Sequence, residues 1–195
     1  MSKGGFEMLS KIMHALQQDA AKWKQCESLF EKIELPSKTT LLCEGDTAAR
    51  MYIVKKGCLR LWFNHDGKDI TFQFFFENQA VSSFESFFGD QPSIFSLESI
   101  ESTIAVAVTR ENWERLFSIY PHLKDEFHKL LLQRMGIYAR LFLSRIKDTP
   151  QERYEALQRE HPEILRRIPQ HYIASYLGIT PVSLSRIRRR LTVIS

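Results

Sequence analysis

The 195-residue sequence has few of the features that mark membrane or secreted proteins. No apolar run approaches the roughly 20 residues that a membrane helix needs. The first residues, MSKGGFEMLSKIMHALQQ, are interrupted by charged and polar side chains, so they do not form a secretory signal. We therefore expect a cytoplasmic protein with no membrane partner.

Cysteine is scarce, with three residues at positions 26, 43 and 58. The odd number and the lack of a close pair argue against a disulfide framework, and a four-thiolate iron–sulfur cluster would need one more cysteine. We expect Cys26, Cys43 and Cys58 to be small buried apolar side chains. The sequence predicts no metal site and no cofactor.

Motifs of common enzyme classes are also absent. The sequence contains no glycine-rich phosphate loop, no G-x-S-x-G and no H-E-x-x-H. A cupin-type metal site would need several histidines among the strands, but that region holds only His65, in a turn beside Asp66 and Gly67. We expect His65 to face solvent and the protein not to be an enzyme.

Acidic residues are absent after Glu163, whereas six arginines follow it. From Pro121 onward there are 14 Lys or Arg against 7 Asp or Glu, whereas residues 1–120 hold 13 against 16. A run of charge is usually a solvated face. It indicates an anionic partner when a specific motif coincides with it, as here.

Hydrophobic periodicity indicates a helical start followed by a strand-rich region. Apolar residues at spacings of three or four predict a helix over residues 6–34. Between about 38 and 108, β-branched and aromatic runs alternate with turn signals, and Asp66-Gly67 predicts a hairpin turn. Several short strands at close spacing favour a small antiparallel barrel or jelly roll.

The second half is predicted to be helical, with Pro121 separating a short helix from a long one that ends near Lys147. The long helix carries two apolar stripes, one at Leu123, Phe127, Leu130, Ile137 and Leu141, the other at Phe127, Leu131, Met135, Tyr138, Phe142 and Ile146. One stripe can pack on the β-region and the other on a parallel copy of the helix. Complete burial within one domain is the alternative, and Arg134 fits neither arrangement. Residues 148–150 predict a linker that caps a short helix over 150–160.

Residues 168–190 predict a helix-turn-helix. The small Ala174 lets a second helix pack closely, Gly178 permits the positive φ of the turn, and Thr180 can cap the second helix ahead of Pro181. The apolar residues expected to hold the two helices together are Ile173, Leu177, Ile179, Leu184 and Ile187.

The second helix of this motif is strongly basic. Its exposed positions are expected to place Val182, Ser183, Arg186 and Arg189 against base edges in the major groove of double-stranded DNA. We expect Arg188 and Arg190 to contact phosphates, which makes binding steeply salt-dependent. Thr180 completes the candidate DNA-binding set. A basic helix pair with no nucleic-acid role is the alternative.

The order of helix, strand-rich region, long helix and helix-turn-helix resembles the cyclic-AMP receptor protein/FNR (Crp/Fnr) family of bacterial regulators. The run IPQHYIASYLGITPVSLSRIRRRL is similar to the form of the family common in Bacteroidetes, and the resemblance covers about Leu29 to Leu191. It implies an α+β fold: an N-terminal helix with an antiparallel β-roll (jelly-roll, cyclic-nucleotide-binding-domain-like) over 1–120, a dimerisation helix over 121–147, and a winged-helix-like helix-turn-helix domain over 148–195.

The resemblance also implies partners. A homodimer would read two half-sites on double-stranded DNA roughly 34 Å apart. RNA polymerase and an unknown small-molecule effector are further candidate partners. The alternative function is a non-enzymatic small-molecule-sensing or protein-interaction module whose basic C-terminus is not a specific DNA reader.

The sequence departs from the family's phosphate-binding cassette. Ser82-Ser83 stands where cyclic-AMP binders have Gly-Glu, and no arginine occurs between Arg60 and Arg110. Because a buried phosphate would then lack a cation, we expect no binding of cAMP or cGMP by the usual chemistry. The candidate pocket for another effector comprises Ser82, Ser83, Phe84, Glu85 and Ser93. A roll interior filled by phenylalanine is the alternative.

Two departures concern the DNA-binding end. Only residues 191–195 follow the predicted recognition helix, so we expect the family's wing to be truncated or absent. Val182 also stands where a polar base-reading residue is common in the family. Specificity is therefore expected to depend mainly on Ser183, Arg186 and Arg189.

Overall fold

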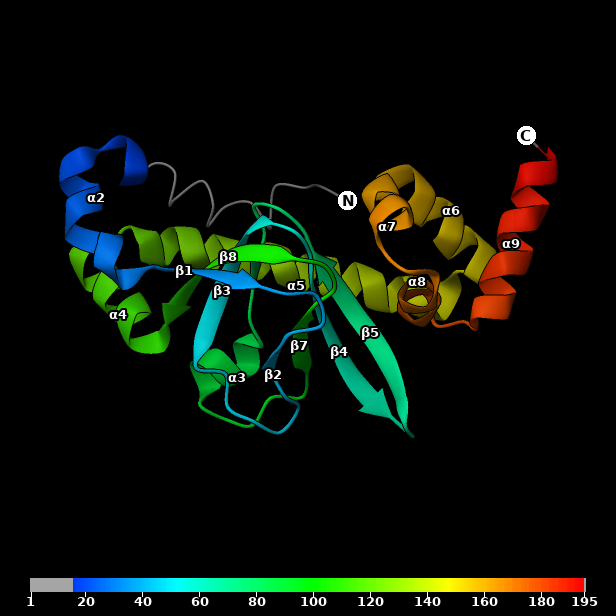
Figure 1. The fold of residues 1–195 in the computed structure, drawn as a ribbon, viewed down its shortest axis with the longest axis horizontal. Helices are drawn as coiled ribbons and strands as arrows, with labels where there is room; N and C mark the ends of the chain where they lie inside the picture. The colour runs from blue at the N-terminus through cyan, green and yellow to red at the C-terminus, as the bar shows by residue number, and fades with distance from the viewer. Residues whose placement is uncertain (1–15, 195) are drawn as a thin grey trace.

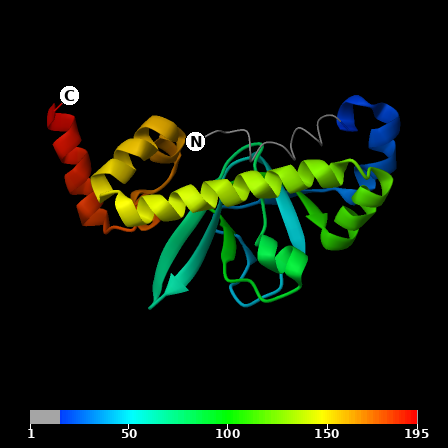
Figure 2. The same ribbon diagram turned by 180° about the vertical axis from the view of Figure 1, so that it is seen from behind.

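The computed structural model describes residues 16–194, in which one long helix carries a β-roll along its length and a helical unit at one end. This helix is α5 (Leu123–Lys147). Figure 1 shows α5 running behind the sheets, and Figure 2 shows it in front, passing from α4 (Arg110–Ile119) to the helical unit. The predicted α+β architecture with an antiparallel β-roll is confirmed.

The β-roll consists of two four-stranded sheets in which every pairing is antiparallel. One sheet has the order β1 (Glu31–Leu35), β8 (Thr103–Thr109), β3 (Arg50–Lys56), β6 (Ala80–Val81). The other has the order β2 (Thr40–Leu42), β7 (Ser96–Ser99), β4 (Leu59–His65), β5 (Lys68–Phe75). A short helix, α3 (Phe84–Gly89), lies between β6 and β7 in the chain.

The hairpin of β4 and β5 turns at Asp66-Gly67, as predicted. Asp66 has φ 51° and Gly67 has φ 76°, the two positive values that a type I′ turn requires. His65 beside the turn is exposed, also as predicted. Cys26 and Cys58 are buried as predicted, but Cys43 is exposed because it begins a turn in which its carbonyl accepts from the Asp46 amide.

The helix predicted over residues 6–34 is wrong at its C-terminal end. The chain forms α2 (Ala20–Cys26) and a 3-10 turn, η1 (Glu27–Leu29), and then enters β1. Residues 31–35 pair with β8 from Glu31↔Ala107 to Leu35↔Thr103, so strand pairing overrides a helical pattern that only the earlier residues carried. Residues 6–15 of the prediction lie outside the described residues.

Helix α5 packs one of its predicted stripes against the β-roll and α4. Leu123, Phe127, Leu130 and Ile137 are buried, and Leu141 is half-buried. Arg134 is buried in the same stripe because its guanidinium donates to the Ala80 carbonyl and lies 4.4 Å from the Phe84 ring centroid. A buried arginine is therefore compatible with this stripe.

The second predicted stripe of α5 is partly wrong. Phe127 is buried, and Leu131 and Tyr138 pack on the chain's own cores. The exposed apolar face comprises Leu132, Met135, Ala139, Phe142 and Ile146. These residues recur at alternating steps of three and four, the spacing of a coiled-coil seam.

The helical unit follows a sharp break at Asp148. It contains α6 (Pro150–Glu160), α7 (Pro162–Arg167), α8 (Gln170–Leu177) and α9 (Pro181–Ile194). Thr149 and Glu152 form a capping box with Pro150 in the first turn of α6, so the predicted cap and helix over 150–160 are confirmed. Within residues 16–194, no helix combines the length and apolar character needed to cross a membrane.

Candidate nucleic-acid interface

Helices α8 and α9 form the predicted helix-turn-helix. Ala174 is fully buried between them, and Gly178 ends α8 with φ 68° and ψ 36°. A Cβ at position 178 would lie 2.7 Å from a nitrogen at the flexible end of the Arg145 side chain, which can shift, so it is the positive φ that favours glycine. Arg145 in turn donates to the Tyr176 carbonyl and ties the turn to α5.

The start of α9 is capped as predicted. The Thr180 hydroxyl accepts from the Ser183 amide at 3.1 Å, with Pro181 at the first helical position. Leu184 and Ile187 are buried against the rest of the unit. The opposite side of α9 therefore faces solvent.

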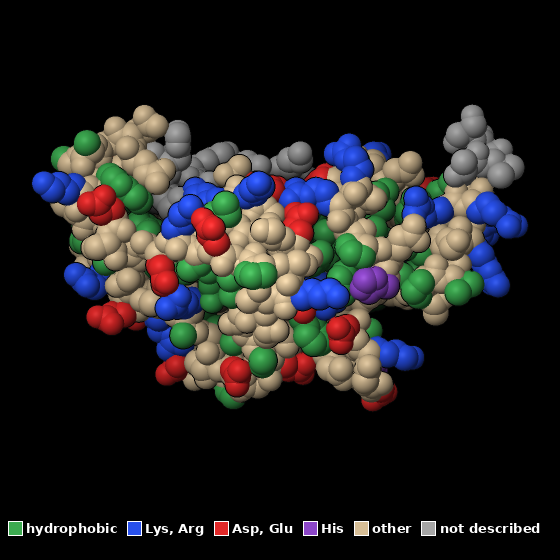
Figure 3. All heavy atoms as spheres, viewed as in Figure 1, with side chains coloured by type: hydrophobic (Ala, Val, Ile, Leu, Met, Phe, Trp, Pro, Cys, Tyr) green, Lys and Arg blue, Asp and Glu red, His purple; other side chains and the backbone are tan. Residues whose placement is uncertain are grey.

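The predicted base-reading and phosphate-binding residues lie on this outward side. Val182 and the four arginines at 186, 188, 189 and 190 are exposed. Figure 3 shows Lys and Arg side chains gathered at the end of the molecule that α9 forms. Ser183 differs because it is half-buried and its hydroxyl lies 3.0 Å from that of Thr180.

The surface also extends to a part of the chain that the sequence did not point to. A hollow of about 760 Å³ lies between α9 and the start of α6, lined by Thr149, Pro150, Gln151, Ile179, Ser183, Arg186, Ile187, Arg189 and Arg190. The first turn of α6 carries the positive end of its helix dipole, which favours an anion there. The Thr-Pro cap in the sequence was a signal for this helix start, but not for its place beside α9.

The residues of the candidate effector pocket lie close together, but the polar ones mainly form hydrogen bonds with one another or with the backbone. Ser83 donates to the Glu85 carboxylate, the Ser93 hydroxyl lies 2.5 Å from that of Ser83, and Ser82 donates to the Arg50 carbonyl at 3.0 Å. Of the five, Ser82 alone lines the cavity of about 340 Å³ that is formed mainly by residues of β2, of the β2–β3 connection and of β3. Phe84 packs instead against Arg134 and Phe127.

Aromatic and aliphatic side chains fill the interior of the roll. Phe75 is fully buried among Leu59, Leu61 and Leu97, and the Phe72 ring lies 4.7 Å from Phe95 and 5.1 Å from Tyr138. This packing supports the phenylalanine-filled interior that the sequence left open as an alternative.

Comparison with known proteins agrees with this architecture. Residues 32–120 match the family model of the cyclic nucleotide-binding domain. Among solved structures, the chain is similar to FixK2 from Bradyrhizobium japonicum, with a TM-score of 0.71. The two are 18% identical, and the match covers 84% of this chain and 85% of FixK2. The chain has the fold of the Crp/Fnr regulators.

Other structures of this fold are similarly distant in sequence. A transcriptional regulator of the Crp/Fnr family from Eubacterium rectale has a TM-score of 0.70 at 17% identity over 90% of this chain and 84% of that one. The catabolite activator protein of Thermus thermophilus has a TM-score of 0.57 at 21% identity over 89% and 83%. None of the curated proteins matches the sequence. The predicted resemblance to the Crp/Fnr family is confirmed at the level of the fold.

Within the described residues, the chain beyond Arg190 does not turn into a wing strand. Residues 191–194 continue α9 as helix. The truncated wing expected from the sequence is therefore replaced over these residues by helix, because no glycine or proline separates them from the preceding turns of α9.

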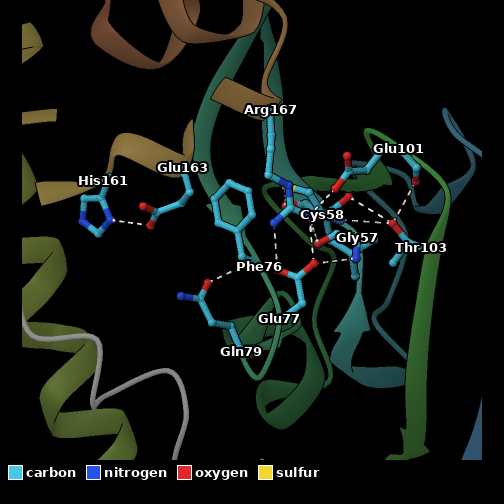
Figure 4. Close-up of polar contacts among 11 residues, drawn as sticks. Gly57, Cys58, Phe76, Glu77, Gln79, Glu101, Thr103, His161, Glu163 and Arg167 are labelled. Atoms are coloured by element: carbon cyan, nitrogen blue, oxygen red, sulfur yellow. Dashed lines mark hydrogen bonds and ion pairs between the residues drawn. The ribbon is translucent and has the colours of Figure 1, made fainter. Parts of the chain in front are cut away.

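An ion-pair cluster that no sequence motif predicted joins the β-roll to α7. Arg167 points between Glu77 and Glu101 (Figure 4), with its guanidinium 2.8 Å from the Glu77 carboxylate and 3.1 Å from the Gly57 carbonyl. The hydrogen bond from Arg167 is the main reason that the pKa of Glu77 is lowered to about 2.

A second contact joins the roll to α8 through the fully buried Arg60. Its guanidinium lies 2.7 Å from the Glu98 carboxylate and donates to the Thr71 hydroxyl at 3.1 Å, with the Tyr172 ring 4.0 Å away. Beside it the Ser175 hydroxyl accepts from the Thr71 amide at 2.8 Å and donates to the Asp69 carbonyl at 2.7 Å. Strand β5 is thus bonded directly to the first helix of the helix-turn-helix.

The Arg167 cluster predicts a pH dependence of stability. Because the pKa of Glu77 falls from 4.5 to about 2 on folding, its contribution is present above pH 4.5 and lost as the pH falls toward 2. After discounting for a carboxylate that is one-third exposed, we expect Glu77→Gln to lower the free energy of unfolding at neutral pH by about 1–2 kcal/mol.

Urea unfolding between about pH 7 and pH 3 measures this effect. The difference between wild type and Glu77→Gln should shrink as the pH falls. Glu111→Gln, at an exposed position of α4, serves as the control and should leave stability nearly unchanged. A Glu77→Gln deficit that stays constant down to pH 3 contradicts the assignment.

Proposed function

We propose that this protein is a transcription regulator that binds specific DNA sequences as a homodimer, with α9 in the major groove. The observation that carries the proposal is the capped α9 after the Gly178 turn, which buries Leu184 and Ile187 and exposes four arginines, with Arg186 and Arg189 on the side opposite the buried pair. The hollow beside α6 adds a place for the DNA backbone. In this proposal the chain has three functional parts: a β-roll sensor domain over residues 1–120, a dimerisation helix over 121–147 and a DNA-binding domain over 148–195.

The arginines of α9 are predicted to have two distinguishable roles. Arg186→Ala should weaken binding to the preferred sequence by about 1–3 kcal/mol and relax discrimination at one base pair, because a bidentate contact to guanine is lost. Arg190→Ala should weaken binding to preferred and unrelated DNA alike. It should also reduce the slope of log affinity against log salt concentration by about one, because one phosphate contact is lost. Fluorescence anisotropy over a salt series measures both effects.

Arg115→Ala is the matched control, because Arg115 is an exposed arginine on α4, far along the chain from α9. It should leave DNA affinity unchanged. If Arg186→Ala and Arg190→Ala change the two kinds of DNA in the same way, the division of roles is wrong.

The exposed face of α5 supports a dimer. Leu132, Met135, Phe142 and Ile146 are each about two-thirds exposed, and Ala139 lies in register between them. A contiguous apolar stripe of this kind is usually covered by a partner. A second copy of α5 covers it with matching heptad spacing, which places two α9 helices on one DNA duplex.

We further propose that the β-roll does not bind cAMP. The Ser83, Glu85 and Ser93 side chains bond to one another where a cyclic phosphate would need a cation, and aromatic side chains occupy the interior. Isothermal titration of the full chain with cAMP should give no saturable heat. Saturable binding at micromolar or tighter affinity contradicts this prediction.

A further inference from the structure

Helix α9 presents one stripe of side chains away from the rest of the helical unit, at one end of the molecule (Figure 1). The members of this outward stripe follow one another at steps of three, one and three residues, which place them on the same face of a helix. All of them are exposed, and they are Val182, Ser185, Arg186 and Arg189. In a helix that enters the major groove, such a stripe decides which base edges are contacted.

Two other polar side chains of α9 lie beside the outward stripe rather than in it. Ser183 is half-buried, and its hydroxyl lies 3.0 Å from that of Thr180. Ser183 and Arg190 both line the hollow beside α6, whereas Val182 and Ser185 do not. Because the start of α6 favours an anion, this flank suits a phosphate of the DNA backbone, and the outward stripe is left to face the bases.

The chemistry of the outward stripe limits the bases that it can distinguish. Arginine binds the O6 and N7 acceptors of guanine, a carboxylate accepts from the N4 amino group of cytosine, and an amide side chain binds adenine at two points. The sequence of α9, PVSLSRIRRRLTVI, contains no Asp, Glu, Asn or Gln. Besides guanine contacts from arginine, the stripe therefore offers a serine hydroxyl, which is compatible with several bases, and one apolar side chain.

Val182 is that apolar side chain, and neither packing nor helix propensity accounts for it. It lies in the first turn of α9 and is 60% exposed, so it adds little to the apolar contacts that hold the unit together. A β-branched residue is also less favourable at an exposed helical position than alanine or a long unbranched side chain. The C5-methyl group of thymine is the apolar group that a base edge presents in the major groove. An exposed valine that enters this groove therefore matches thymine.

We propose that Val182 selects thymine at one position of each half-site by packing against the C5-methyl group of that base. Val182 and Arg186 are four residues apart, which is about 6 Å along the helix axis. Successive base pairs are about 3.4 Å apart. The thymine therefore lies one or two base pairs from the guanine that Arg186 binds. This role of Val182 rests on the proposed DNA-binding function and adds to it the base that one side chain selects.

Deoxyuridine tests the contact, because it keeps the hydrogen-bonding groups of thymidine and lacks the methyl group. The probe is the duplex that the purified full chain selects from random-sequence DNA, remade with deoxyuridine in place of one thymidine in each half-site, position by position. We expect one position at which the substitution weakens binding about fourfold per half-site, the effect of one buried methyl group. This position should lie within about two base pairs of the one that Arg186→Ala relaxes. Fluorescence anisotropy measures the affinities.

Val182→Ser removes the apolar contact and should bind the thymidine and deoxyuridine duplexes equally well. Ile94→Ala is the matched control, because Ile94 is also 60% exposed but lies in the β-roll, between α3 and β7. It should respond to deoxyuridine like the wild type. Both positions are exposed, so circular dichroism should show both variants folded.

Several results overturn the role of Val182 while specific DNA binding stands. They are binding that is insensitive to deoxyuridine at every position, equal sensitivity in wild type and Val182→Ser, and the same loss of sensitivity in Ile94→Ala. A sensitive position farther than about two base pairs from the guanine of Arg186 also overturns it. Recovery of no enriched sequence in the selection overturns the proposed function, and the role of Val182 with it.

Discussion

Met135→Asp should convert the proposed dimer to a monomer and lower its affinity for the full DNA site by about 100-fold or more. Met135 lies at the centre of the exposed seam of α5, so two copies of the variant would bury two carboxylates without partners. A monomer binds one half-site and loses the gain that comes from linking two binding events. Sedimentation equilibrium and anisotropy with a two-half-site duplex measure the two effects.

Gln133→Asp is the matched control, because it introduces the same charge at an exposed position of α5 off the seam. It should remain dimeric and bind DNA like wild type. Circular dichroism should show both variants folded, since both positions are exposed in one chain. A monomeric wild type, or a dimeric Met135→Asp, would show that α5 is not the dimer interface.

Arg60→Leu should lower the free energy of unfolding by about 3–5 kcal/mol. Arg60 is fully buried between β4 and α8, and the side chain of Glu98 beside it is only 13% exposed. Removing the guanidinium leaves the carboxylate buried without its cation and also removes the contact with the Tyr172 ring. Urea unfolding measures the loss.

The double variant Arg60→Leu/Glu98→Leu should recover most of this stability, because both charges are then gone and apolar side chains replace them. Arg50→Leu gives the comparison for an exposed pair: Arg50 and Glu31 are 2.8 Å apart with both side chains largely in water, and we expect a loss of about 1 kcal/mol or less. Equal losses for Arg60→Leu and Arg50→Leu would contradict the importance of the buried contact.

Local signals in the sequence were enough to predict the helix-turn-helix. The residues that define a helix-turn-helix act through nearby backbone geometry: Gly178 through its positive φ, Thr180 through a hydrogen bond three residues away, and Ala174 through close packing. The Asp66-Gly67 turn was predictable for the same reason. Such features depend on few long-range contacts.

Features that depend on distant segments were missed or misplaced. The predicted end of the first helix was wrong because residues 31–35 pair with β8, from 68 (Leu35↔Thr103) to 76 (Glu31↔Ala107) residues away in the chain. The seam of α5 was shifted because Leu131 and Tyr138 pack on the chain's own cores, which periodicity alone does not reveal. Likewise, Arg60 and Arg167 gave no signal, since their partners become neighbours only on folding.

The most direct test of the account is selection from a pool of random-sequence DNA duplexes by the purified full chain, followed by sequencing of the bound DNA. If α9 reads bases from a dimer, the bound pool should be enriched in a two-fold symmetric motif with half-sites about 10 base pairs apart. Enrichment should become weaker at one position of each half-site with Arg186→Ala. Recovery of a pool with no enriched sequence, at a salt concentration where the protein still binds DNA, would contradict specific DNA reading by this protein.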